Sequence, residues 1–194
     1  TTGYPAASDK GIPADQKETG SQDYSSFTVK MVLLGIGISG FCALAYEVFW
    51  TRMLNLFFHN TVYSFTTILA TFLTGIAIGS LVYWKFLSRV SNKVLLFVYM
   101  EIGIGVLAYL TPFIFNWLYE PLFSKAAETF TILKAGVIMV GPTFLMGIAL
   151  PLAVQICQQG PRHEGSSVGT VYAVNTVGSI LGSFAAGFLL MPNL

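Results

Sequence analysis

Five long apolar stretches constrain the fold of this chain more than any other feature. They run from about 27 to 50, 62 to 87, 94 to 118, 130 to 157 and 168 to 191. About 20 apolar residues, rising about 1.5 Å each, cross the roughly 30 Å hydrocarbon core of a bilayer. Backbone polar groups in lipid must be satisfied within the chain, and the strict alternation of barrel strands is missing, so helices are expected. The sequence therefore predicts an all-α integral membrane protein with five transmembrane helices.

The composition supports a membrane location and argues against several other classes of protein. Charged residues make up 10% of the chain and hydrophobic residues 54%, whereas a soluble domain carries about 25% charge. A soluble core would also require polar outer faces on these stretches. The net charge of +1 suggests no nucleic-acid partner. Cys42 and Cys157 lie far apart in apolar stretches, behave as small hydrophobes and do not have the spacing of metal ligands. No Ser/His/Asp or Cys/His constellation is present, so we expect no metal, cofactor or catalytic site.

Residues 1–26 form a polar segment that differs from everything after it. It is rich in Ser, Gly, Asp and Lys, and such a composition cannot bury enough apolar surface to fold alone. We expect a flexible tail, followed by one transmembrane domain at 27–194. Because five spans are an odd number and the chain stops directly after the fifth, we also expect a polypeptide that is truncated before a sixth helix or a further domain.

The orientation follows from Lys and Arg in the loops, which favour the cytoplasmic side. With five spans, seven of the ten basic residues fall on the same side as the N-terminus and three on the other. The first group is Lys10, Lys17, Lys30, Lys85, Arg89, Lys93 and Arg162, and the second is Arg52, Lys125 and Lys134. The tail is therefore predicted to be cytoplasmic and the C-terminus external.

Small residues recur at four-residue spacing in two spans. Thr71, Gly75 and Gly79 form one such stripe in the second span. Gly178, Gly182 and Ala186 form another in the fifth. In lipid, such stripes let helix backbones approach closely. We expect a tightly packed bundle.

Two prolines lie in the fourth span. Pro142 and Pro151 each remove a backbone hydrogen bond and are expected to kink or interrupt the helix. An interrupted helix can line a transport site, whereas a simple kink would be structural.

The polar candidates in the first span are Glu47 and Arg52. They are five residues apart and point about 140° away from each other on an ideal helix, so a direct pair would require an unwound turn. Arg52 is expected at the helix end, where a cation complements the helix dipole. Tyr46, Trp50 and Arg52 could together form an interfacial anchor, which leaves Glu47 unexplained.

Glu101 is the more unusual charge. It lies about 11 Å into the third span at 1.5 Å per residue, and Asn175 lies at a similar depth in the fifth. Intramembrane charges are costly and usually face a bundle interior. We hypothesise that Glu101 and Asn175 share a polar interior that serves as a proton relay or cation site. The alternative is a neutral carboxyl hydrogen-bonded between helices.

Four strings carry a resemblance to a known family. They are residues 40–54 (GFCALAYEVFWTRML), 66–81 (TTILATFLTGIAIGSL), 141–153 with GPTFLMG and LPLA, and 168–192 (VGTVYAVNTVGSILGSFAAGFLLMP). In this order they resemble the membrane region of bacterial fused spermidine synthase-like proteins, whose helices are similar to a six-helix half of a major facilitator bundle. The resemblance implies a bacterial inner-membrane location. It also implies a soluble aminopropyltransferase-like domain, which this sequence does not contain.

Three functions are open at this point. The favoured one is a non-enzymatic membrane scaffold or anchoring subunit that packs with other membrane subunits or a second helical half. The second is a transporter-like half-bundle for a polyamine or another cation, using Glu101, Asn175 and Glu47. The third is the membrane fragment of an aminopropyltransferase-like enzyme.

Overall fold

The described part of the chain is built from five long helices. The computed structural model describes residues 24–57, 61–123, 128–158 and 164–190. Two of the α-helices continue directly into π-helical turns. The elements are α1 (Ser26–Phe57), α2 (Thr61–Val82), η1 (Tyr83–Leu87), α3 (Lys93–Phe123), α4 (Glu128–Cys157), α5 (Glu164–Phe184) and η2 (Ala185–Leu190).

The fold class predicted from the sequence is confirmed. Each of the five helices contains a segment that is long and apolar enough to cross a membrane, and the described residues form no strand. The expected bounds differ mainly at the first helix, which continues to Phe57. The prediction that Arg52 ends this helix is therefore wrong, because helical hydrogen bonding continues beyond it. The expected tail lies almost wholly outside the described residues.

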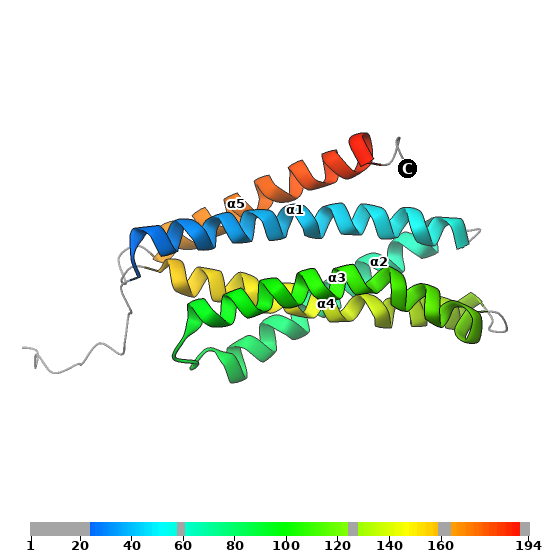
Figure 1. Ribbon diagram of the computed structural model, residues 1–194, viewed down its shortest axis with the longest axis horizontal. Coiled ribbons are helices and arrows are strands. Elements are labelled where there is room, and N and C mark those ends of the chain that lie inside the picture. Colours follow the sequence, from blue (N-terminus) through cyan, green and yellow to red (C-terminus); the bar gives the residue numbers. More distant parts are fainter. Residues whose placement is uncertain (1–23, 58–60, 124–127, 159–163, 191–194) are drawn as a thin grey trace, which may run out of the picture.

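The helices alternate in direction, and α4 is central among them. In Figure 1, α1 and α5 run side by side, while α2 and α3 accompany α4. Of the residues in the α4 span 50% are buried, compared with 17% to 28% in the other four spans. α1 packs mainly on α5 and more lightly on α4, and its contact with α3 is sparse. This sparse contact between α1 and α3 leaves room for the site described below.

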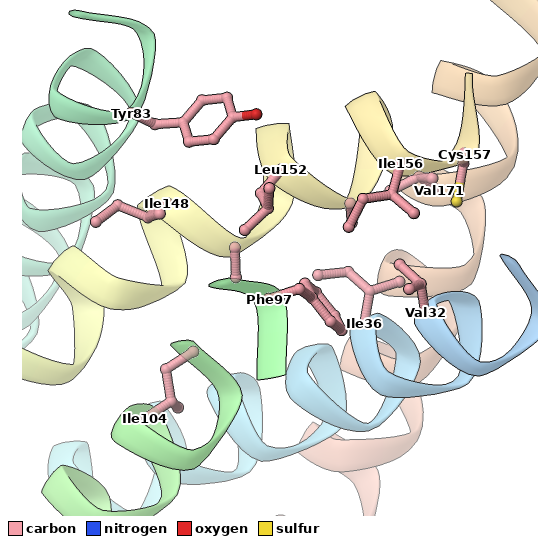
Figure 2. Close-up of a cluster of buried hydrophobic side chains, with 12 residues drawn as sticks. Val32, Ile36, Tyr83, Phe97, Ile104, Ile148, Leu152, Ile156, Cys157 and Val171 are labelled. Carbon is pink, nitrogen blue, oxygen red and sulfur yellow. The ribbon is translucent and has the colours of Figure 1, made fainter. Parts of the chain in front are cut away.

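The apolar core lies around one face of α4. Ile148, Leu152 and Ile156 are fully or almost fully buried, and their four-residue spacing places them on one side of a helix. Figure 2 shows these side chains along α4, with Phe97 of α3 and Val32 of α1 gathered on the same side of that helix. The cluster, which also includes Val171 and Tyr83, therefore joins α1, α3, α4, α5 and η1.

The outer faces of the helices are also apolar. Large hydrophobic side chains such as Leu73, Phe113 and Phe188 expose more than half of their surface. Exposed apolar surface of this extent is unfavourable in water but is the ordinary surface of a helix in hydrocarbon. The exposure pattern therefore agrees with the membrane assignment.

The two predicted glycine stripes lie in the two closest helix contacts. A Cβ placed on Gly75 or Gly79 would meet Thr143 or Phe144 of α4, and a Cβ on Gly178 or Gly182 would meet the backbone of α1. The absence of side chains at these positions lets the backbones touch, as expected from small residues in membrane helices. The stripes are thus used within the chain.

Both prolines of α4 lie inside a helix that continues through them. The hypothesis of an interrupted fourth helix is therefore wrong. A proline cannot donate to the carbonyl four residues earlier, so Pro151 leaves the Gly147 carbonyl free. The Ser80 hydroxyl of α2 donates a hydrogen bond of 2.9 Å to this oxygen. A polar group exposed by the proline is thus satisfied by a neighbouring helix, as hydrocarbon requires.

Replacing Ser80 with alanine should destabilise the protein by about 1 kcal/mol, the usual scale of an interhelical hydrogen bond in a membrane. The Pro151→Ala variant restores the backbone N–H, which can then bind the Gly147 carbonyl itself. In the Pro151→Ala variant, Ser80→Ala should lower the free energy of unfolding by much less. The free energies of unfolding of the four proteins in this double-mutant cycle give the coupling directly. Equal costs of Ser80→Ala in both backgrounds would show that the hydroxyl does not serve the proline-freed carbonyl.

Candidate intramembrane binding site

A cavity of ≈ 730 Å³ lies between α1 and α3, closed on one side by Met146 of α4. This volume is within the range of about 300–1,000 Å³ typical of small-molecule sites. Its walls are almost entirely aliphatic and aromatic. The lining residues are Gly35, Ile38, Ser39, Phe41, Cys42, Ala45, Tyr46, Phe49, Glu101, Ile102, Ile104, Gly105, Ala108 and Met146.

The lining follows from helix periodicity. On α1, Ser39, Cys42, Tyr46 and Phe49 recur at intervals of three and four residues, so they form one stripe along the helix. On α3, Glu101 and Gly105 line the cavity one helical turn apart, so they lie on the same face of the helix. One face of α1 and one face of α3 thus lie opposite each other, and their side chains do not fill the space between them.

Glu101 is the acidic group among the described residues that line this cavity. Its Oε1 atom is buried and has no hydrogen-bond partner among the described residues. The Ser39 hydroxyl, from the buried side of α1, is the neighbouring polar group at this carboxyl. The site therefore combines an apolar chamber with a carboxyl group whose hydrogen-bonding capacity is incompletely used.

One end of the cavity is fixed by a second proline-freed carbonyl. Pro112 of α3 cannot donate to the Ala108 carbonyl, and the Tyr46 hydroxyl of α1 donates to this oxygen over 3.4 Å. The Tyr46 ring also meets Trp50 edge-on, with ring centroids 6.0 Å apart. These contacts connect α1 to α3 and hold an aromatic face in the cavity wall.

The expectation that Asn175 shares a polar interior with Glu101 is not confirmed. Asn175 lies in the contact of α5 with α1, where its backbone and side-chain oxygens face Gly40. The neighbouring Ser179 hydroxyl donates to the Gly40 carbonyl over 3.2 Å. Asn175 is not among the cavity-lining residues, and its place is that of a packing residue.

Glu47 and Arg52 do not form the site either. Glu47 is half-buried, Arg52 is exposed, and no ion pair joins them in the described part of the chain. The hydroxyl of Thr51 donates to the Glu47 backbone carbonyl over 2.8 Å. Glu47 does not line the cavity, so the two acidic residues singled out in the sequence have different surroundings.

Comparison of the chain with protein-family models, curated protein sequences and solved structures gave no match. The resemblance to fused spermidine synthase-like proteins stays a prediction from the four sequence strings. Within the described residues, no three His, Cys, Asp or Glu side chains gather as metal ligands would.

Sequence reasoning found Glu101 but missed its companions. Ser39 was not considered, Cys42 was interpreted only as a small hydrophobe, and Tyr46 only as an interfacial anchor. The signal that could have found them is their three- and four-residue spacing on α1, which places them on the same face as the apolar residues around them.

Proposed function

We propose that this chain binds an organic cation within the membrane, in the α1–α3 cavity, as part of a transporter-like helical bundle. The observation that carries the proposal is the Glu101 carboxyl, whose buried Oε1 has no hydrogen-bond partner among the described residues and lies in a chamber of ≈ 730 Å³. An ammonium group would supply both the missing hydrogen bond and the opposite charge.

The energetics favour such a ligand. A carboxylate in hydrocarbon is costly unless it is paired, and for that reason acidic residues in membrane spans usually mark ion or substrate pathways. A hydrogen bond to a charged group contributes about 1.5–3 kcal/mol. Ser39 can orient the carboxyl from the α1 side without neutralising it, which leaves the charge available to a ligand.

The proposed location is the bacterial inner membrane with the N-terminus in the cytoplasm. Lys30 lies near the start of α1, and Lys85, Arg89 and Lys93 lie around the connection of α2 to α3. Figure 1 places these two regions at the same end of the bundle, which agrees with the cytoplasmic preference of basic residues. The basic residues at positions 10, 17, 125 and 162 lie outside the described residues.

The scaffold or anchoring function stays a prediction with weaker support. Its arguments are the odd number of spans, the missing catalytic domain and the two small-residue stripes, which could have bound other subunits. Gly79 and Gly178 instead pack against α4 and α1 of the same chain. An aminopropyltransferase-like partner domain likewise stays a prediction from the resemblance.

Glu101→Gln should weaken the binding of an organic cation at least tenfold, about 1.4 kcal/mol or more. The variant keeps the shape of the side chain but removes its negative charge. Binding would be measured to the protein in lipid nanodiscs with a panel of cations that includes spermidine and an aryl-alkyl amine. Glu47→Gln is the matched control, because Glu47 is half-buried in α1 but does not line the cavity, and it should change affinity less than twofold. If no cation in the panel binds in a Glu101-dependent way, the proposal is wrong.

A further inference from the structure

The chemistry of the cavity wall narrows the ligand class further. We infer, building on the proposed function, that the cavity selects an amphiphilic monocation, a single ammonium on an apolar body, over a polyamine. The inference rests on the number of charges facing the cavity, the nature of its walls and the direction of its opening.

The described lining offers one negative charge. Glu101 is the carboxylate of the cavity, and the other polar lining groups, Ser39, Cys42 and Tyr46, are a hydroxyl, a thiol and a phenol. A polyamine carries an ammonium every three or four methylene groups. With one ammonium at Glu101, the next would lie against aliphatic side chains, and burying an unpaired charge is strongly unfavourable. A monocation leaves no charge uncompensated.

The rest of the wall fits an apolar body. Ile104, Ala45 and Met146 supply aliphatic surface, and Phe41 and Phe49 supply aromatic rings. Burial of apolar ligand surface against these side chains stabilises the complex in proportion to the area removed from water. The faces of aromatic rings also attract a cation directly. The wall therefore favours a ligand that is mostly hydrocarbon.

The opening of the cavity points to the bilayer. Ile38 of α1 and Ile102 of α3 both line the cavity, yet they are 55% and 57% exposed. They therefore form its rim on the outer face of the bundle, and both lie within segments apolar enough to span a membrane. Amphiphilic amines dissolve in bilayers and can enter from there, whereas a polyamine stays in water. The single negative charge, the apolar walls and the opening towards the bilayer therefore all favour the same class of ligand.

Three compounds of related size test this inference on the full chain in nanodiscs. 4-Phenylbutylamine carries one ammonium, 4-phenylbutanol is its uncharged counterpart, and spermidine is a polyamine. Empty nanodiscs of the same lipid give the partitioning that must be subtracted. We expect the amine to bind at least tenfold more tightly than either of the other two, and Glu101→Gln to reduce its affinity to that of the alcohol.

The outcomes separate the inference from the proposed function. Glu101-dependent binding of spermidine that equals or exceeds that of the amine would overturn the inference and leave the proposed function standing. Equal binding of amine and alcohol, unaffected by Glu101→Gln, would show a site for neutral apolar molecules or acyl chains and would overturn both. Absence of binding by all three would also overturn both. The comparison of amine with alcohol requires no variant, so it tests the need for a positive charge even if Glu101→Gln does not fold.

Discussion

Replacing Gly178 with alanine is expected to destabilise the protein by about 2 kcal/mol or more, because the added methyl group has no space. A Cβ at this position would meet the backbone of Gly37, its carbonyl oxygen first. A backbone atom cannot rotate away as the end of a flexible side chain can, so α5 must move from α1 as a whole. That contact is among the two most extensive between helices in the described structure. The change would be measured as the free energy of unfolding in mild detergent.

Gly169 provides the matched control on the same helix. It is exposed, and a Cβ there meets nothing within 4 Å. Gly169→Ala should be neutral or stabilising by up to about 1 kcal/mol, because alanine restricts the unfolded chain more than glycine does. Similar losses for the two variants would mean that helix propensity, rather than the close contact of α1 with α5, decides the result.

Filling the cavity should abolish most of the cation binding without unfolding the protein. Gly105 lines the cavity from α3, and a Cβ on it meets no atom within 4 Å. Gly105→Leu would therefore place a bulky side chain into the chamber one turn beyond Glu101. We expect cation affinity to fall at least tenfold, about 1.4 kcal/mol, with a change in the free energy of unfolding below about 1 kcal/mol. Both quantities can be measured on the same nanodisc preparation.

The control for this variant is a leucine elsewhere on the surface of the bundle. Gly169→Leu adds the same side chain to α5 at an exposed position outside the cavity, and it should leave the affinity unchanged. If Gly105→Leu binds cations as well as the unaltered protein does, the ligand is not in the α1–α3 cavity. A comparable loss in both variants would point to a general effect on the bundle.

Most of the fold could be predicted because the bilayer leaves few alternatives. The lengths of the five apolar stretches and the need for internal hydrogen bonds were sufficient for helices and their approximate bounds. The glycine spacing correctly identified the close contacts made by Gly79 and Gly178. The end of α1 was predicted too early, because a loss of hydrophobicity after Trp50 shows where the span ends and not where the helix ends.

The candidate site could be predicted only in part. Glu101 was found because a carboxyl in an apolar stretch is costly and therefore conspicuous. Asn175 was wrongly matched to it, because equal depth in two spans says nothing about which helices are neighbours or how each is rotated. Tyr46 and Ser39 went unnoticed as site residues, since Tyr and Ser are unremarkable in membrane helices until a facing helix is known. These relations depend on tertiary packing.

The most direct measurement is the labelling of Glu101 by a hydrophobic carbodiimide in membranes. Such reagents reach carboxyl groups from the hydrocarbon and form an adduct that mass spectrometry assigns to one residue. The account predicts an adduct on Glu101, because its cavity opens to the bilayer between Ile38 and Ile102, and strong protection by 4-phenylbutylamine but not by 4-phenylbutanol. An unlabelled Glu101, or labelling that the amine leaves unchanged, would contradict the claim that this carboxyl holds a cation within the membrane.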